Sequence, residues 1–258
     1  MAGAAAWLDS FESGALNPPQ DVHDPRGWDV YWTNQIKAGP LMQAFSDMMS
    51  SDDRLIPLLA GRHVRTILCA GNGLSTEALS LALHGFHVTA LDVSSVPGAR
   101  MVASLSDPDG AHSRLPGFGV TGNTVRFGDA GLLGSDVCPR IHRTDAHPPQ
   151  GGGSLTFATG DLMDPGVCAG PFDAVIERRT VQLFPEAERP AAVDRLVSRL
   201  ADRGLFVSHH HDGCGRPGET THYATSLITA RGFVLDYQTD AETRSSAPRL
   251  ACLRLSTG

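Results

Sequence analysis

The chain has 258 residues and a formal net charge of −7 at neutral pH. This length suits one large α/β domain with a sizeable core, and the acidic balance argues against a broad nucleic-acid-binding surface. No apolar run reaches the roughly twenty residues that a membrane-spanning helix needs. Residues 1–16 lack the basic flank and apolar core of a signal peptide. We therefore expect no nucleic-acid partner and no membrane association.

The five cysteines are scattered along the chain and include no C-x-x-C pair. An odd, unpatterned set is typical of reduced thiols and not of a disulfide framework. The sequence thus predicts a cytoplasmic protein, and it leaves a monomer and a homodimer equally open.

The N-terminal segment, residues 1–60, is predicted to be a helical lid. Residues 24–59 have a helical pattern in two pieces, and Trp28, Tyr31 and Trp32 recur at spacings that place them on one helix face. One interpretation packs this aromatic stripe onto the sheet. The other makes it a cover that contacts a bound substrate, where aromatic faces attract a positive group by cation–π interaction.

Residues 64–94 have the pattern of a strand, a glycine turn, a helix and a second strand. The first strand ends at Gly71 and Gly73, Ser75 precedes the helix, and Asp92 ends the second strand. Glycines let the backbone bend tightly and approach a ligand, and a helix N-terminus offers unpaired N–H groups. An acidic side chain about twenty residues further on suits a ribose diol. The segment predicts a nucleoside-containing cofactor, with a ligand-free turn as the plain alternative.

The rest of the chain continues the alternation of strands and helices. Residues 96–105 are predicted to be a helix, and residues 106–153 a Gly- and Pro-rich insertion with a small hairpin around residues 124–127. An insertion this long indicates either a substrate-selecting loop over the active-site mouth or a solvated excursion. The remaining predicted elements are strands at 155–159, 172–176, 205–208, 232–234 and 250–255, and helices at 185–202 and 223–231.

The segment CAGNGLS, residues 69–75, resembles the first motif of class I S-adenosylmethionine (SAM)-dependent methyltransferases. Gly71 and Gly73 match, Ser75 stands where a third glycine is common, and Cys69 stands where the family usually has an acidic residue. The dinucleotide fingerprint G-x-G-x-x-G is incomplete, because Thr76 occupies its third glycine position. FDAVIE and the turn DRGL further along also resemble family motifs, in the family's order.

The resemblance implies a Rossmann-like α/β fold: a seven-stranded, mostly parallel sheet with helices on both faces and one antiparallel terminal strand. Residues 61–258 would form the SAM-binding domain, interrupted by the insertion at about 106–153. The implied function is in-line transfer of the SAM methyl group to an oxygen, nitrogen or sulfur nucleophile of a small-molecule acceptor.

The resemblance also assigns residues to the cofactor. Asp161, just after the third strand, would bond the adenine amino group; a rival alignment uses Asp129 in Phe127-Gly128-Asp129. The complete expected set of cofactor contacts is Cys69, Gly71, Gly73, Ser75, Asp92, Val93, Asp161, Leu162 and Glu177.

The acceptor side rests on the aromatic helix and on the ends of two strands. The segment WDVYW resembles the W-D-x-x-[WY] segment of thiopurine-methyltransferase-like proteins, which implies substrate contacts from Trp28, Tyr31 and Trp32. Glu177 and Arg178 leave the fourth strand at its carboxyl end, where open α/β sheets bind ligands. They are predicted to take part in catalysis by orienting the substrate, with a surface salt-bridge cluster as the alternative.

Histidines follow the fifth strand in a cluster with other possible ligands, His209, His210, His211, Asp212, Cys214 and His222. On an extended chain only His209 and His211 converge, and we consider them as general bases near neutral pKa. A metal site and ordinary polar loop residues are the alternatives. Because the spacing matches no zinc framework, we predict no resident metal.

Two other classes of protein remain open. A non-catalytic SAM-binding or scaffold protein would explain the missing acid at Cys69. A nucleotide-dependent Rossmann-like oxidoreductase would explain the glycine turn and Asp92, but not the terminal strand pattern.

Overall fold

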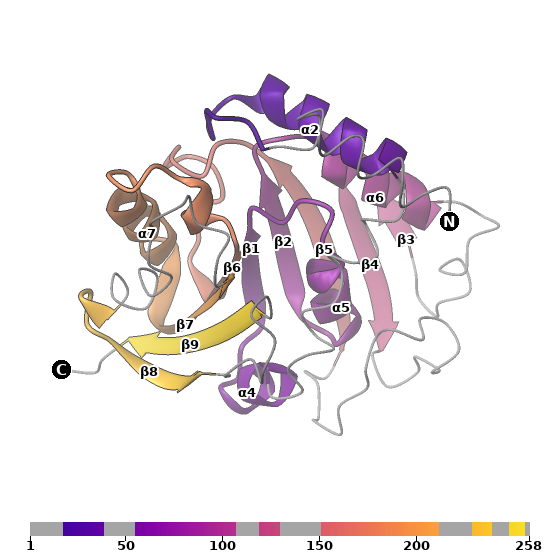
Figure 1. The fold of residues 1–258 in the computed structure, drawn as a ribbon. Helices are drawn as coiled ribbons and strands as arrows, with labels where there is room; N and C mark the ends of the chain where they lie inside the picture. Colours follow the sequence, from indigo (N-terminus) through magenta and orange to yellow (C-terminus); the bar gives the residue numbers. More distant parts are fainter. Residues whose placement is uncertain are drawn as a thin grey trace.

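The computed structural model describes residues 18–38, 55–106, 119–129, 151–211, 229–238 and 248–255, with residues 129, 209–211, 235–238 and 248–255 described as backbone alone. These ranges contain one mixed sheet of nine strands in the order β3-β4-β5-β2-β1-β6-β7-β9-β8 (Figure 1). The strands are β1 (Thr66–Ala70), β2 (His87–Asp92), β3 (Gly119–Thr121), β4 (Thr124–Asp129), β5 (Gly152–Thr159), β6 (Phe172–Arg178), β7 (Leu200–His211), β8 (Phe233–Gln238) and β9 (Pro248–Leu255).

Seven of these strands form the predicted Rossmann-like arrangement. β5, β2, β1, β6 and β7 are parallel neighbours. β9 is antiparallel to both β7 and β8, between which it lies, so the expectation of a reversed terminal strand is confirmed. Because the strand order reverses beside β1, a crevice opens above the carboxyl ends of β1, β2 and β6, where such sheets bind ligands.

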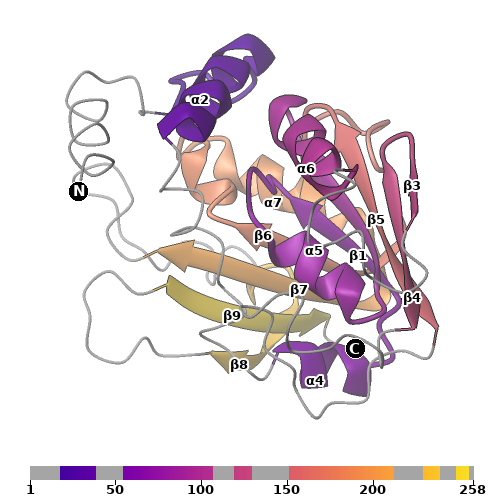
Figure 2. The ribbon, with the colours of Figure 1, turned by 90° about the vertical axis from the view of Figure 1, so that its right-hand side faces the viewer.

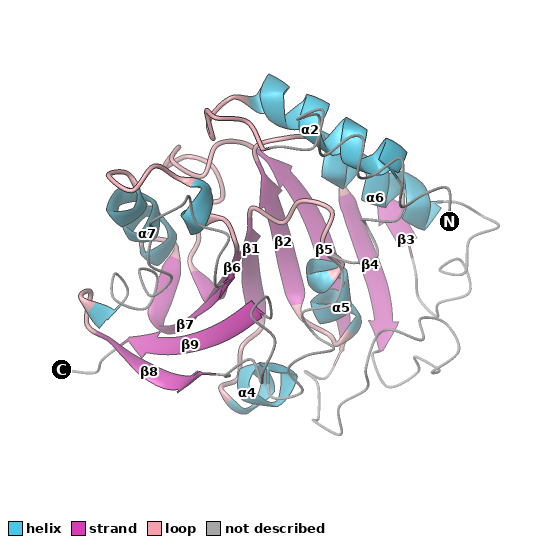
Figure 3. Cartoon of the chain, viewed as in Figure 1, coloured by secondary structure: helices cyan, strands magenta, loops and turns pink. Residues whose placement is uncertain are grey.

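Helices cover both faces of the sheet (Figure 3). They are α2 (Pro25–Ala38), α4 (Leu55–Gly61), α5 (Glu77–Leu83), α6 (Val96–Ser106), the short 3₁₀ helix η3 (Val181–Leu183) and α7 (Arg189–Val197). α4 and α5 share one hydrophobic core with the sheet. α7 packs into a second core on the opposite face, together with Phe206 and Phe233. Since strands at the centre of the sheet are covered on both sides, β1 consists almost entirely of buried residues.

The predicted hairpin of the insertion is confirmed, and it lengthens the sheet. β3 pairs with β4, and β4 pairs antiparallel with β5, which adds two strands at that edge. Asp129 of the rival alignment pairs with Gly152 at the start of β5, the end opposite to the crevice. The rest of the insertion, residues 107–118 and 130–150, lies outside the described residues.

The region around α7 differs from the prediction of one helix over residues 185–202. The described helix is shorter, and Leu200 already belongs to β7. Arg199 explains the early end: its side chain is 1% exposed, and it donates hydrogen bonds to the carbonyls of Leu162, Asp164, Val167 and Cys168. This buried anchor turns the chain from the helix into the strand. The predicted helix at 223–231 lies mostly outside the described residues.

The predicted lid, residues 1–60, divides into parts with different positions. α2 crosses the molecule above the carboxyl ends of the strands (Figure 2). α4 instead packs into the core, where Leu55, Ile56 and Leu59 are almost fully buried. Of the described part of the predicted lid, the segment 18–38 is therefore the one that covers the crevice. No helix within the described ranges is long and apolar enough to cross a membrane.

Candidate functional site

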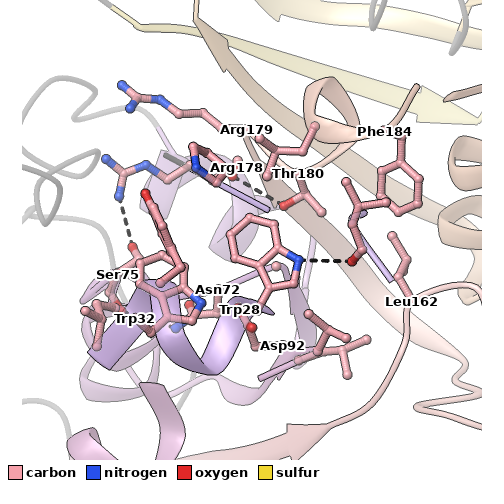
Figure 4. A pocket seen from close by; sticks show the side chains of 18 of the residues that line it. Trp28, Trp32, Asn72, Ser75, Asp92, Leu162, Arg178, Arg179, Thr180 and Phe184 are labelled. Carbon is pink, nitrogen blue, oxygen red and sulfur yellow. Dashed lines mark hydrogen bonds between the residues drawn. The ribbon is translucent and has the colours of Figure 1, made fainter. Parts of the chain in front are cut away.

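A cavity of about 300 Å³ lies between α2 and the carboxyl ends of β1, β2, β5 and β6. Its walls come from five parts of the chain: the glycine turn after β1, the end of β2, the residues after β5, the segment from Arg178 to Phe184, and the covering segment 18–38. Figure 4 shows these side chains converging on the same space. Of the predicted contacts, the cavity is lined by Trp28, Tyr31, Trp32, Gly71, Ser75, Asp92, Val93, Asp161, Leu162 and Arg178.

The turn needs glycine at two positions because of its backbone conformation and because of the side chains that pack on it. Gly71 and Gly73 have φ angles of +61° and +51°, in the left-handed region that side chains disfavour. A Cβ on Gly71 would lie 2.1 Å from the Oγ1 of Thr180, and one on Gly73 would lie 2.6 Å from the Trp32 ring. The turn can therefore hold its shape only with glycine at both positions.

Asp92 braces the glycine turn from the end of β2. Its Oδ2 accepts the Gly73 N–H at 2.8 Å, and its Oδ1 accepts the Ser94 N–H at 3.0 Å. Burial raises the pKa of Asp92 to about 6, against the opposing effect of these N–H groups and of the nearby Trp32 indole. The carboxylate is thus ionised at neutral pH, lines the cavity, and keeps lone pairs for further donors.

Ser75 joins the start of α5 to the end of β6. Its Oγ accepts the Glu77 N–H at 3.2 Å and also accepts Arg178 Nη1–H at 3.0 Å (Figure 4). Glu77 is buried beside this pair, and burial raises its pKa to about 7 despite the attraction of Arg178. These contacts hold the Arg178 guanidinium at the rim of the glycine turn.

Asp161 and Leu162 line the cavity just after β5, the strand next to β2. One oxygen of Asp161 accepts the Met163 N–H at 2.8 Å, and the other lies 2.8 Å from the His23 ring. Leu162 is mostly buried in the same core as Phe184. The Asp161 carboxylate can accept hydrogen bonds from the edge of a flat heterocycle, and the apolar surface of Leu162 suits its face.

The three aromatic residues of α2 form a continuous cluster. The Trp28 and Trp32 rings are stacked with centroids 6.1 Å apart, and Tyr31 meets them edge-on at 5.3 and 4.8 Å. All three line the cavity, while Trp28 is also 6% exposed. The stripe packs onto the molecule and lines the cavity, and contact with a bound substrate stays a prediction.

Cys69, Gly73 and Glu177 are the predicted residues that do not line the cavity. Glu177 is 1% exposed; its carboxylate accepts the N–H groups of Thr180 and Val181 at 3.0 and 3.2 Å and the Ser208 hydroxyl. Cys69 is 3% exposed, and burial raises the pKa of its thiol well above its ordinary value. Direct cofactor contacts from Cys69 and Glu177 are therefore corrected to supporting roles, because both side chains point into the protein.

The histidines at the end of β7 are strand residues, whereas a position after the strand was expected. The backbone of His209 pairs with Arg178 on one side and Leu250 on the other, and His211 pairs with Pro248. Their side chains lie outside the described part of the structure. Where side chains are described, no cluster of three His, Cys, Asp or Glu residues could hold a metal ion.

Other lining residues were not predicted from the sequence. Asn72, Thr180 and Gln182 contribute polar groups to the wall, and Val22 belongs to the segment before α2. Thr180 also donates to the Ala70 carbonyl at 2.9 Å. Its place after β6 was a usable signal, because residues that follow neighbouring parallel strands meet at one edge.

Comparisons with known proteins agree with this architecture. No protein-family model matches the chain, and no curated protein matches its sequence. Among solved structures, magnesium protoporphyrin IX methyltransferase (ChlM) from Synechocystis PCC 6803 with bound SAM is 16% identical with a TM-score of 0.51, over 98% of this chain and 97% of that chain. A TehB-like SAM-dependent methyltransferase from Corynebacterium glutamicum is 15% identical with a TM-score of 0.52, over 86% and 97%.

The [4+2]-cyclase SpnF is similar to the same degree, 13% identical with a TM-score of 0.51 over 83% of this chain and 84% of that one. At such identities the likeness establishes the fold and nothing finer. The chain has the Rossmann-like α/β fold of the class I SAM-dependent methyltransferases.

Proposed function

We propose that the protein is a SAM-dependent methyltransferase that acts on a small-molecule acceptor. One observation carries the proposal. The cavity above the glycine turn is lined by both Asp92 and Asp161, which come from the carboxyl ends of the neighbouring strands β2 and β5, at the switch point of a sheet with a reversed terminal strand. That arrangement suits a ribose near Asp92 and an adenine near Asp161.

The residues present fit SAM in chemical type. The Gly71 turn leaves bare backbone against the cavity, Asp92 is an ionised acceptor for hydroxyl groups, and Leu162 offers an apolar surface beside Asp161. We assign the adenine to Val93, Asp161 and Leu162, the ribose to Asp92, and the remaining part of SAM to the turn and Ser75. Cys69 and Glu177 support this site from beneath.

The acceptor would lie under α2. Trp28, Tyr31 and Trp32 enclose that side, and Arg178 enters from the end of β6. When bound, SAM supplies a methyl group on a positively charged sulfur. The chain has to hold a nucleophile in line with that bond and exclude water, which positioning by the aromatic cover achieves. A cavity of this size admits a small molecule.

Other features belong to the same proposal. Residues 61–258 would bind SAM, and residues 18–38 would be the lid. Catalytic proton removal by His209 or His211 stays a prediction, as do a cytoplasmic location and a monomeric or homodimeric state. The thiols of Cys69 and Cys168 are free.

A calorimetric titration tests the cofactor directly. S-adenosylhomocysteine and SAM should each bind at one site with a dissociation constant in roughly the micromolar range, and NAD⁺ should not compete. Added acceptors would then be screened for conversion of SAM to S-adenosylhomocysteine. Binding of NAD⁺ without binding of either sulfur compound would overturn the proposal, and binding without turnover over a broad acceptor panel would favour a scaffold.

A further inference from the structure

A histidine just before α2 joins three separate parts of the cavity rim. His23 Nδ1 lies 2.8 Å from Asp161 Oδ2, and His23 Nε2 lies 3.1 Å from Glu188 Oε2. The ring also packs edge-on against Phe184, with centroids 5.5 Å apart. Asp161 follows β5, Glu188 precedes α7, and Phe184 follows η3, so a single imidazole links the lid segment to the loops at one end of the cavity.

The charges around this imidazole are mostly negative. Asp161 and Glu188 face its two nitrogens, and Asp21 of its own segment accepts the His23 backbone N–H at 2.9 Å. Arg199 is a positive group close enough to Asp161 to interact with it electrostatically. Burial alone would lower the pKa of His23, but hydrogen bonds and charges from Glu188 and Asp161 outweigh that effect and raise it above 6.5.

The segment that carries His23 is bonded to α2, because Trp28 Nε1 donates to the Val22 carbonyl at 3.0 Å. At the other side of the cavity, Asp29 of α2 accepts the Ser94 hydroxyl at 2.6 Å. The cover is therefore attached at both sides of the opening. The His23 attachment contains an imidazole, and an imidazole changes its charge near neutral pH.

We propose that His23 is a positioning residue for the adenine end of the bound nucleoside. It attaches the lid segment 18–38 to the cavity rim only while both its nitrogens donate to Asp161 and Glu188. This inference rests on the proposed function. Asp161 uses one lone pair of Oδ1 for Met163 and one of Oδ2 for His23. Each oxygen has a second lone pair, and a carboxylate fixed in this way can present one to an exocyclic amine.

The attachment of the lid segment through His23 depends on pH. Only the protonated ring can donate from both nitrogens; a neutral ring turns a bare nitrogen toward one carboxylate. Both hydrogen bonds are therefore present below the raised pKa of His23, and the attachment is lost as pH rises through that pKa. Nucleoside affinity should then fall on the alkaline side, together with the preference for adenine.

The test uses the full chain with 5′-methylthioadenosine, whose own charge is constant between pH 6.5 and 9. Its inosine counterpart carries a carbonyl in place of the exocyclic amine. The wild type should bind 5′-methylthioadenosine about tenfold more weakly at pH 9 than at pH 6.5, and prefer it to the inosine form by about tenfold at pH 6.5, as expected for one charge-assisted hydrogen bond. His23→Ala should reduce that preference to about threefold or less.

His23→Arg keeps a permanent positive charge with several donors, so it should bind 5′-methylthioadenosine nearly equally at pH 6.5 and 9. His87→Gln is the matched control, because His87 is exposed at the opposite end of β2, where its ring bonds Ser154; it should behave like the wild type. A wild type without an alkaline loss, or a His23→Arg profile identical to it, would overturn the inference. Absence of binding by the wild type at every pH would instead sink the proposed function.

Discussion

Replacing Asp92 with asparagine is expected to weaken binding of S-adenosylhomocysteine by about a hundredfold or more. The carboxylate holds the Gly73 N–H at 2.8 Å and would accept the ribose hydroxyls, and hydrogen bonds to an ionised group contribute about 1.5–3 kcal/mol each. Asparagine has one acceptor oxygen and would turn an amide N–H toward a backbone N–H. Calorimetric titration of both proteins at pH 7.5 measures the difference.

Asp92→Asn should also remove the loss of affinity for S-adenosylhomocysteine that the wild type shows at acidic pH. Burial raises the pKa of Asp92 to about 6, and ribose binding favours the ionised form. Wild-type affinity should therefore fall as pH drops through about 6, while Asp92→Asn should be weak and nearly constant from pH 5 to 7. Asp202→Asn, on the exposed surface, is the control and should bind like the wild type. Wild-type affinity in Asp92→Asn would show that the ribose lies elsewhere.

Replacing Gly71 with alanine is expected to cost about 2–4 kcal/mol of folding stability and to abolish measurable cofactor binding. The left-handed backbone at φ +61° disfavours a Cβ, and the new atom would lie 2.1 Å from Thr180 Oγ1 in a packed region. For a chain of this length the melting temperature should fall by roughly 5–15 °C. Thermal unfolding followed by circular dichroism measures it.

Gly119→Ala is the matched control for that experiment, because its Cβ would meet no atom within 4 Å and its φ is not left-handed. Removing the obstacle gives a second check. In a Thr180→Ala background, which lacks the clashing Oγ1, Gly71→Ala should cost less than in the wild type, as contacting residues are coupled in a double-mutant cycle. Equal costs in both backgrounds would mean that Thr180 does not limit this position.

Much of the sheet could be predicted from the sequence, because its signals are local. Apolar runs marked β1, β2, β5 and β6, and the glycine turn marked the ligand edge. The motif order then predicted the reversed terminal strand. The same reasoning placed Asp92 and Asp161 at that edge, since each directly follows or ends a parallel strand.

The sequence predictions were wrong where contacts with residues distant in sequence determine the structure. Glu177 ends a strand at the ligand edge, as a catalytic acid would, yet its carboxylate turns inward to accept the N–H groups of Thr180 and Val181. Arg199 ends α7 early by bonding carbonyls more than thirty residues away. His23 had no motif at all, because its importance comes from Asp161 and Glu188, which are 138 and 165 residues away in sequence.

A crystal structure of the chain with S-adenosylhomocysteine is the most direct test of the central claim. We predict ribose hydroxyls within hydrogen-bond distance of Asp92, the adenine amine on Asp161, and the sulfur facing the chamber beneath Trp28 and Tyr31. A nucleoside bound away from the Gly71 turn, or a cavity that stays empty at saturating S-adenosylhomocysteine while the ligand occupies another surface, would contradict the account.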